Sequence, residues 1–356
     1  MQHILVTGTT GLIGGIVAAQ LLTRKDTFLI LPVRARSETE AYVRLARSLK
    51  RFTDVPLCEE RVKIIAGDLA AVADSSDRIL KDVTHVVHAA ADTSFLGRRN
   101  VWQVNYDDTC RFAERMRRCP QLERFLYIGT AWICGNNPPA IVKEDLYPMA
   151  GIDHHVEYSR SKAATEQHLA GMSDFPLLIV RPSVVVGHTT LGCKPTASLF
   201  WVFFTFDRMR QITWSQSNYI DVVPADYVGL ALQTLLFLPE PDYRCYHISS
   251  GFASSCNWQQ IADAFGLVAG ESAKPNPYNQ VNCFSDEALE QLYPTSVRRL
   301  RRAIELYARF ASHNTVFDNT RLLEVGCPPP PRFIDWIPQC LETIAGRTID
   351  DLMGDD

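Results

Sequence analysis

The feature that most constrains the fold is a repeated alternation of short apolar runs with helical patterns in the first half of the chain. The runs are nearly continuous in hydrophobicity, as expected of strands buried on both faces of a parallel sheet. They lie at 3–8, 28–34, 62–68, 85–90, 124–130 and 176–187, with one further run at 245–250. Between them lie helical patterns at 12–24, 38–52, 103–118 and 158–171. This alternation predicts βαβ units and an α/β fold around a doubly wound parallel sheet.

A glycine-rich loop follows the first expected strand directly and opens the first expected helix. Its glycines have the spacing G-x-x-G-x-x-G. Small residues let a backbone approach a pyrophosphate, and a helix N-terminus supplies N–H groups and a positive dipole end. A glycine-rich turn without a ligand has the same spacing, but strand, loop and helix in succession favour a Rossmann-type dinucleotide site. The loop residues expected to contact the cofactor are Gly8, Thr10, Gly11, Leu12, Ile13 and Gly14.

The end of the second expected strand indicates which dinucleotide is bound. A site that prefers NAD usually places Asp or Glu here, as a partner for the ribose hydroxyls. This strand ends in LPVRARS, with Arg34 and Arg36 and no acid. A carboxylate would repel a 2′-phosphate, whereas a guanidinium can hold one with two hydrogen bonds. The contrast favours NADP(H), with Arg34 as the better candidate, although arginines after a strand are also common as plain surface charges.

The alternation of strands and helices stops after Gly187. Helical stretches, prolines and polar loops follow without a clear βαβ order, and the strand pattern returns only briefly before residue 250. We therefore expect a Rossmann domain of residues 1–187 plus 219–250, and a smaller, discontinuous substrate-binding lobe of residues 188–218 plus 251–356. Such a lobe would cover the carboxyl ends of the strands, where open α/β sheets bind ligands.

A tyrosine and a lysine lie four residues apart in the segment EYSRSKAATEQ. Positions i and i+4 share one face of a helix, so Tyr158 and Lys162 are neighbours if this segment is helical. A free tyrosine has a pKa near ~10, and a nearby ammonium lowers that pKa and makes the phenol a usable acid or base. An exposed helical pair has the same spacing. However, the strand that ends in the hydroxyl of Thr130 lies upstream and favours catalysis at the carboxyl end of the sheet.

Several motifs follow one another in the order seen in extended short-chain dehydrogenases/reductases. Besides the glycine loop, they are GDL at 67–69, HAAA at 88–91, Asn105, GTA at 129–131, YSRSK at 158–162 and RPSVVVG at 181–187. The chain resembles that family over roughly residues 3–250, and the ordered set is far more specific than any single motif.

The resemblance implies a role for each matching residue. Thr130 would orient the substrate oxygen, Tyr158 would exchange its proton, and Lys162 would lower the pKa of Tyr158 and hold the nicotinamide ribose. Most relatives carry Ser at the position of Thr130, and Thr keeps the hydroxyl. The further cofactor-binding residues that the resemblance implies are Asp68, Leu69, Ala89, Ala90, Ala91, Asn105, Pro182, Ser183 and Val184.

Within that family the sequence is most similar to the thioester reductase and fatty acyl-CoA reductase branch, which is also described as male-sterility-like. The similarity lies in LPVRARSETEAYVRLARSL at 31–49, in ADTSF at 91–95, in YIDVVPADYVGLAL at 219–232 and in FDNTRLLEVGCPPPP at 317–331. Relatives in this branch reduce carrier- or CoA-bound thioesters to aldehydes, and some continue to alcohols. We therefore expect an NADP(H)-dependent reductase of an acyl thioester or the derived aldehyde, with a carrier protein as a candidate partner.

The substrate side is less well marked in the sequence. The residues expected to touch the substrate are Asp92, Ala131, Trp132 and His188. The aromatic segment SLFWVFFTFDRM at 198–209 has two interpretations. In the first, it forms an apolar wall for an acyl or aryl chain. In the second, which we favour, it packs into the core of the lobe or into a dimer interface.

Other functions are compatible with parts of this set of motifs. A nucleotide-sugar epimerase or a ketone reductase of the same family shares the catalytic trio, but epimerases favour NAD, against Arg34 and Arg36. A dehydratase would need an Asp-Glu pair after the catalytic hydroxyl, where Ala131 and Trp132 stand. A non-catalytic dinucleotide-binding sensor or scaffold commonly loses the tyrosine or the lysine, and this chain keeps both.

Composition and charge argue against nucleic acid, membranes and metal ions as partners. The 36 basic and 40 acidic residues give a net charge of −4, which provides no basic footprint for nucleic acid or for an anionic membrane. The apolar runs are too short to span a bilayer, and no signal pattern stands at the start, so we expect a cytoplasmic protein. The ten cysteines show no zinc-ligand spacing, so we expect no metal. A homodimer is common in the family, but no residue here establishes one.

Overall fold

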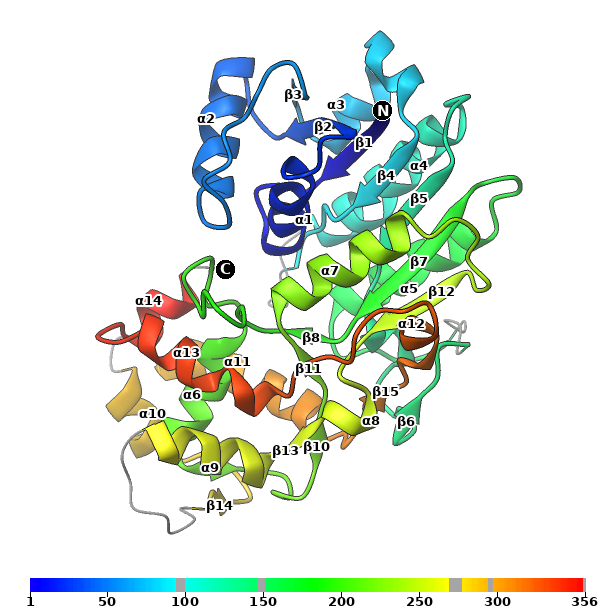
Figure 1. The fold of residues 1–356 in the computed structure, drawn as a ribbon. Helices are drawn as coiled ribbons and strands as arrows, with labels where there is room; N and C mark the ends of the chain where they lie inside the picture. Colours follow the sequence, from blue (N-terminus) through cyan, green and yellow to red (C-terminus); the bar gives the residue numbers. More distant parts are fainter. Residues whose placement is uncertain (94–99, 146–150, 269–276, 294–296, 355–356) are drawn as a thin grey trace.

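A seven-stranded parallel sheet forms the centre of the protein. The computed structural model describes residues 1–93, 100–145, 151–268, 277–293 and 297–354. The strands follow the order β12-β7-β5-β4-β1-β2-β3, and every neighbouring pair is parallel (Figure 1). They are β1 (Gln2–Thr7), β2 (Thr27–Val33), β3 (Val62–Ala66), β4 (His85–His88), β5 (Arg124–Ile128), β7 (Leu177–Pro182) and β12 (Cys245–Ile248). The predicted Rossmann-type sheet is confirmed, with its change of strand order between β1 and β4.

Helices cover both faces of this sheet. On one face α1 (Leu12–Leu22), α2 (Glu38–Leu49) and α7 (Ala225–Leu236) pack on Ile4 and Val6. On the other face α3 (Leu69–Asp74), α4 (Thr109–Arg117) and α5 (Glu157–Ala170) pack on Leu5. Successive residues of β1 therefore point to opposite faces, and each face is buried, which explains the continuous apolar runs.

Short elements connect these layers. Three of them are η1 (Arg78–Asp82), a π-helical segment η2 (Gln103–Asp108) that leads into α4, and η3 (Ala131–Cys134) directly after β5. Short strands pair outside the main sheet, namely β6 (Ile141–Val142) with β15 (Val316–Phe317), β8 (Val184–Val185) with β11 (Val222–Val223), β10 (Tyr219–Ile220) with β13 (Cys256–Asn257) and β9 (Gln211–Ile212) with β14 (Asn279–Gln280).

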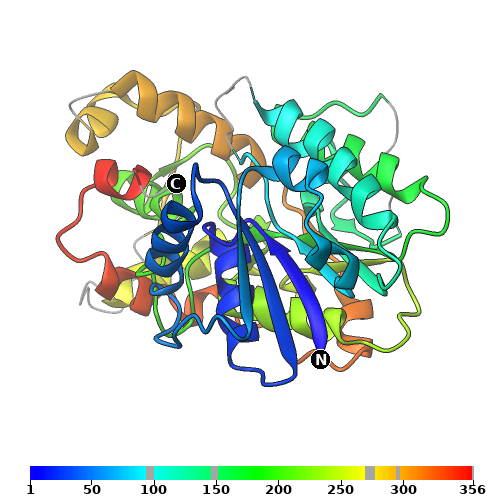
Figure 2. The same ribbon diagram turned by 90° about the horizontal axis from the view of Figure 1, so that it is seen from above.

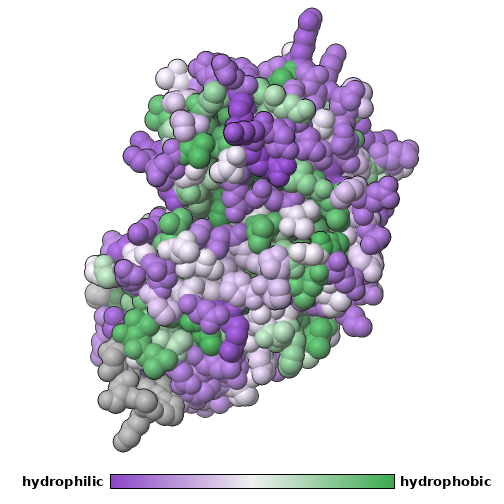
Figure 3. Space-filling model, viewed as in Figure 1, coloured by the Kyte–Doolittle hydropathy of each residue, from purple (hydrophilic) through white to green (hydrophobic). Residues whose placement is uncertain are grey.

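The remaining helices build a lobe beside the carboxyl ends of the strands (Figure 1). They are α6 (Phe200–Met209), α8 (Gly251–Ser254), α9 (Trp258–Val268), α10 (Asp286–Leu292), α11 (Val297–Ala311), η4 (Phe333–Asp335), α13 (Ile337–Thr343) and α14 (Ile349–Met353). Helix α12 (Thr320–Glu324) lies beside β12 instead, and Leu322 and Cys327 pack in the core of the sheet. In the space-filling view the outline narrows on one side, where the sheet and the lobe meet (Figure 3).

The aromatic segment at 198–209 packs inside the lobe. Phe200, Trp201, Phe203 and Phe206 of α6 are at most 3% exposed. Phe203 stacks on Trp258 of α9, with 5.5 Å between the ring centroids. The packing interpretation is therefore confirmed for these four side chains. Among the residues that the structure describes, no helix has the length and apolarity needed to cross a bilayer.

Candidate active site

The glycine loop is held in backbone contact with the loop after β4. Gly8 has a φ of 71°, and a Cβ at this position would lie 2.7 Å from the backbone of Ala89 and Ala90. A Cβ on Gly14 would overlap the carbonyl of Gly8. Only glycine fits these two positions, because the fold brings β1, α1 and the β4 loop together there. The predicted residues Ala89 and Ala90 thus lie beside the glycine loop.

The N-terminus of α1 has the properties of an anion site. Gly11 is its N-cap, no side chain caps the helix, and the first turn contains no acidic residue. Gly11 and Thr10 are exposed, while Leu12 and Ile13 are partly buried. The first N–H groups and the positive end of the helix dipole therefore remain available to a ligand, and these residues fit a dinucleotide diphosphate.

Two residues that the sequence analysis did not single out support this loop from behind. Ser48 Oγ and Arg51 Nη2 both donate to the carbonyl of Thr10, at 3.1 and 2.8 Å. Arg51 Nη1 also donates to the carbonyl of Pro195 in the lobe, at 3.0 Å. Arg51 therefore joins the cofactor loop to the lobe. A polar residue at the end of a surface helix gives no sequence signal for this contact, which depends on tertiary structure.

The residues expected at the adenosine end lie at the carboxyl ends of β2 and β3. Arg34 and Arg36 are exposed, and neither guanidinium forms an ion pair within the described part of the chain. The Arg44 guanidinium donates to the carbonyl of Arg34, which fixes the backbone there. Asp68 caps α3 by accepting a hydrogen bond from the Ala71 N–H at 2.9 Å, and Leu69 is partly buried.

Two members of the predicted catalytic trio, Thr130 and Lys162, meet the end of β5. Thr130 follows that strand, is 6% exposed, and its Oγ1 accepts a hydrogen bond from the Trp132 N–H at 3.3 Å. Lys162 Nζ, on α5, donates to the carbonyl of Ile128 at 2.7 Å. Tyr158 lies one turn earlier on the same helix and is partly buried. The hydrogen bond to Ile128 therefore anchors the helix of Tyr158 and Lys162 two residues before Thr130.

Burial controls the protonation of the pair on α5. It lowers the pKa of Lys162 to about 7, against the opposing effect of the negative Glu166. It raises the pKa of Tyr158 to about 12. The expectation that Lys162 lowers the pKa of Tyr158 is therefore not met in this state of the protein, where the ammonium turns to the Ile128 carbonyl and the Tyr127 ring. Tyr158 therefore keeps its proton at neutral pH.

Asn105 is held by hydrogen bonds within the protein. Its side chain is completely buried, accepts from the Asp92 N–H at 2.8 Å, and donates to the Asp92 carbonyl and to Ser161 Oγ. These bonds use both groups of its amide, and the cofactor contact expected of Asn105 stays a prediction. Asn105 positions the Asp92 backbone against α5. His88 likewise connects two elements, because its ring nitrogens lie 2.9 Å from Thr7 Oγ1 on β1 and 3.0 Å from Thr109 Oγ1 on α4.

The remaining residues expected beside the nicotinamide and the substrate lie after β4, β5 and β7. Pro182, Ser183 and Val184 continue β7 into β8, next to the site, while Ala91 and Asp92 follow β4 and are partly buried. Ala131 is fully buried after Thr130. Trp132 packs edge-on against Phe310 and Phe317, with centroids 5.0 and 5.2 Å away. Trp132 therefore stands between Thr130 and the lobe. The ADTSF motif continues into residues 94–95, which lie outside the described residues.

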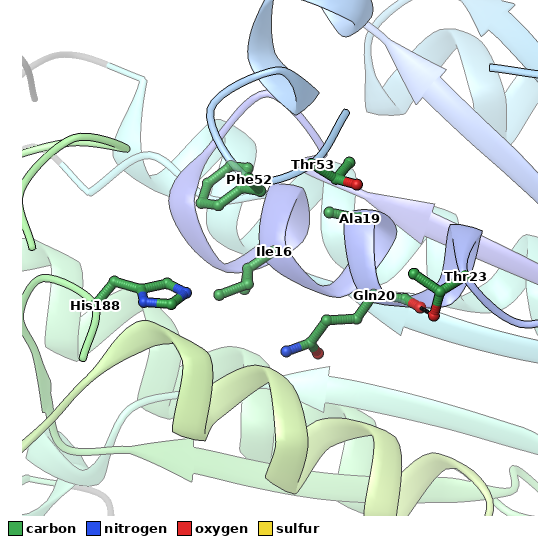
Figure 4. Close-up of a pocket in the computed structure, with 7 residues that line it drawn as sticks. All are labelled: Ile16, Ala19, Gln20, Thr23, Phe52, Thr53 and His188. Carbon is green, nitrogen blue, oxygen red and sulfur yellow. Dashed lines mark hydrogen bonds between the residues drawn. The ribbon is translucent and has the colours of Figure 1, made fainter. Parts of the chain in front are cut away.

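His188 lies apart from the trio. It lines a pocket of about 140 Å³ on the side of α1, with Ile16, Gln20 and Phe52 (Figure 4). Its Nδ1 accepts hydrogen bonds from the N–H groups of Thr190 and Leu191, both at 3.2 Å. No member of the predicted catalytic trio lines this pocket, and the substrate contact expected of His188 stays a prediction. Within the described ranges, no cluster of three or more His, Cys, Asp or Glu is arranged to hold a metal.

The sequence of this site matches a known family. The family model described as "Male sterility protein" matches residues 6–232. The chain belongs to the male sterility protein family. The matched range contains the glycine loop, the trio and all other predicted cofactor residues, whereas most of the lobe lies beyond it.

Curated relatives and solved structures agree with this assignment. The putative fatty acyl-CoA reductase CG8303 of Drosophila melanogaster is 27% identical over 273 residues. The match covers 64% of this chain and 50% of the Drosophila protein, so this chain spans about half the length of that relative. Human fatty acyl-CoA reductase 2 is 23% identical, with 80% of this chain and 66% of the human protein covered. The terminal R domain from the myxalamid PKS-NRPS pathway has a TM-score of 0.78 at 19% identity, covering 98% of this chain and 91% of that domain. This last likeness concerns the fold.

Proposed function

We propose that this protein is an NADP(H)-dependent reductase of an acyl thioester, bound to CoA or to a carrier, or of the derived aldehyde. The observation that carries the proposal is the 2.7 Å hydrogen bond from Lys162 to the Ile128 carbonyl. It joins the Tyr158 and Lys162 helix to the strand end that bears Thr130, beside a loop suited to a dinucleotide. Relatives in the male sterility protein family, such as human fatty acyl-CoA reductase 2, support an acyl substrate.

The cofactor would lie across the carboxyl ends of β1, β2 and β4. The glycine loop and the N-terminus of α1 would hold the diphosphate. Arg34, with Arg36 beside it, would hold a 2′-phosphate, because neither guanidinium has an acidic partner in the described chain. Asp68 and Leu69 would border the adenine, and Ala89 to Ala91 with Pro182 to Val184 would border the nicotinamide. When bound, the nicotinamide supplies the hydride.

The protein's own residues would manage the substrate oxygen and its proton. Thr130 uses its oxygen to accept from Trp132 and retains its proton for the substrate carbonyl. Tyr158, with a pKa raised to about 12, is protonated at neutral pH and can neutralise the alkoxide that forms. A thioester then gains one hydride and one proton and releases a thiol and an aldehyde. A second reduction in the same site would give the alcohol.

The test is cofactor oxidation by the purified protein. NADPH or NADH absorbance is followed with acyl-CoAs, aldehydes and nucleotide sugars, and Tyr158→Phe is compared with Tyr106→Phe, a tyrosine outside the site. We expect NADPH to be consumed with thioesters or aldehydes, and the rate to fall by roughly 10³-fold in Tyr158→Phe only. Conversion of a nucleotide sugar with no reduction of thioesters or aldehydes would overturn the proposal.

A further inference from the structure

Helix α11 concentrates positive charge in a chain that is negative overall. Its sequence, VRRLRRAIELYARFA, contains five arginines and one glutamate, while the whole chain carries a net charge of −4. One face of the helix is apolar and lies in the core of the lobe. The buried residues of that face are Leu300, Ala303, Ile304, Ala308 and Ala311. The arginines therefore occupy the opposite, solvent-facing side.

One arginine of α11 pairs with two acids. Arg301 forms an ion pair with Asp286 of α10, and its Nη1 lies 3.6 Å from Glu305 Oε1. Arg298, Arg302 and Arg309 are exposed, and none of the three forms an ion pair with a described residue, the other two acids of α10, Glu287 and Glu290, included. No ion pair within the described chain therefore offsets these three charges.

These three arginines form a straight row. Their spacing of four and then seven residues places them within a narrow angle of one another on a helix with 3.6 residues per turn. With a rise of about 1.5 Å per residue, the row is roughly 16 Å long. We call Arg298, Arg302 and Arg309 the arginine row.

The end of α11 that carries Arg309 lies near residues of the candidate active site. There Phe310 packs on Trp132, which follows Thr130 by two residues. Just beyond the helix, His313 Nε2 lies 2.9 Å from Nε2 of His155, three residues before Tyr158. The helix runs from these contacts across the lobe and away from the sheet (Figure 2). The exposed arginine row therefore extends along the lobe surface from the neighbourhood of these residues.

We propose that the arginine row is the docking surface for an acidic carrier protein that presents the thioester to this site. This inference rests on the proposed function and specifies its partner. A row of fixed charges about 16 Å long matches an extended acidic surface better than the compact phosphate groups of a free coenzyme. An anionic membrane is a poorer match, because the apolar face of α11 is buried in the lobe and has nothing to insert.

The experiment measures binding and turnover separately. The triple variant Arg298→Gln/Arg302→Gln/Arg309→Gln is compared with Arg78→Gln/Arg118→Gln/Arg244→Gln, which removes three exposed arginines elsewhere. The probe is an acidic acyl carrier protein with an octanoyl-phosphopantetheine group and a fluorescent label, followed by anisotropy. We expect about tenfold weaker binding and a weaker salt dependence in the row variant only. Its kcat/KM for the octanoyl carrier should fall by the same factor, with no change for octanoyl-N-acetylcysteamine, which has no charged carrier.

Other outcomes would reject the docking surface. Equal losses with the carrier and with octanoyl-N-acetylcysteamine would show that the variant damages the site itself. A loss with octanoyl-CoA but not with the carrier would assign the row to coenzyme phosphates. Row-dependent binding to phosphatidylserine vesicles, without carrier binding, would assign it to a membrane surface. If the unaltered protein reduces none of these thioesters, the proposed function fails, while the anisotropy measurement still decides the docking surface.

Discussion

Glu166 and Arg181 form a completely buried ion pair that joins α5 to β7. Arg181 Nε donates to Glu166 Oε2 at 3.0 Å, and Nη2 donates to the other carboxylate oxygen. Glu166 follows Lys162 by one helical turn, so the pair ties the helix that carries Tyr158 and Lys162 to the centre of the sheet. Its negative charge also opposes the effect of burial on the pKa of Lys162. This ion pair thus fixes the position of the helix that carries Lys162, and its glutamate favours the charged form of that lysine.

Removal of one partner of this pair should destabilise the protein strongly. In Glu166→Gln the Arg181 guanidinium stays buried without a counter-charge, which costs about 3–5 kcal/mol of unfolding free energy. The double variant Glu166→Leu/Arg181→Met removes both charges and should recover most of that loss. Urea denaturation of the three proteins measures the difference. A Glu166→Gln protein within about 1 kcal/mol of the unaltered protein would contradict the assigned role of the pair.

The charge on Lys162 should govern the pH dependence of cofactor use. Because its pKa is lowered to about 7, Lys162 is charged below that pH and becomes neutral as the pH rises through it. We expect kcat/KM for NADPH, which reports the free enzyme, to fall as the pH rises through about 7. Loss of the Glu166 charge should move this fall to lower pH, since Glu166 raises the pKa of Lys162. Lys162→Arg stays charged and should lack the fall at any residual activity. A rate that is constant to pH 9 in the unaltered protein would refute this.

Arg34 should decide between the two nicotinamide dinucleotides. In Arg34→Ala the KM for NADPH should rise roughly ten- to a hundredfold, because a charge-assisted contact to the 2′-phosphate is lost. The KM for NADH should change less than about twofold, since NADH has no such phosphate. Arg36→Ala should have a smaller effect, and Lys50→Gln, an exposed lysine after α2, is the control. Equal changes for NADPH and NADH would place Arg34 outside the phosphate site.

The sheet and much of the site follow from local sequence patterns. Each strand of the main sheet was predictable because burial on both faces makes it apolar throughout. The spacing of the glycines predicts a close backbone contact at the loop, where side chains are excluded. Thr130, Tyr158 and Lys162 were singled out by spacing and by the family resemblance, and their catalytic roles remain predictions. Spacing and motif order can be read without knowledge of the tertiary structure.

Burial and long-range contacts were not predictable in the same way. The pKa of Tyr158 is raised because α5 is packed against the sheet, and the i+4 spacing contains no information about that desolvation. Asn105 is enclosed by Asp92 and Ser161, which lie 13 and 56 residues away in the chain. His188 faces α1 because of the path that its loop takes after β8. The contact from Arg51 to Pro195 likewise spans 144 residues.

Arg51 should act on cofactor binding through the glycine loop. Arg51→Lys keeps the positive charge but loses the planar fork that reaches the carbonyls of Thr10 and Pro195 together. Because the Thr10 carbonyl then loses one of its donors, we expect the Kd for NADPH, from quenching of tryptophan fluorescence, to rise about tenfold. The kcat at saturating NADPH should change little, since no catalytic side chain moves. Lys50→Gln, at the preceding residue, should leave both the Kd for NADPH and the kcat unaltered. A lower melting temperature with an unchanged Kd would reduce Arg51 to a structural contact between the two parts of the protein.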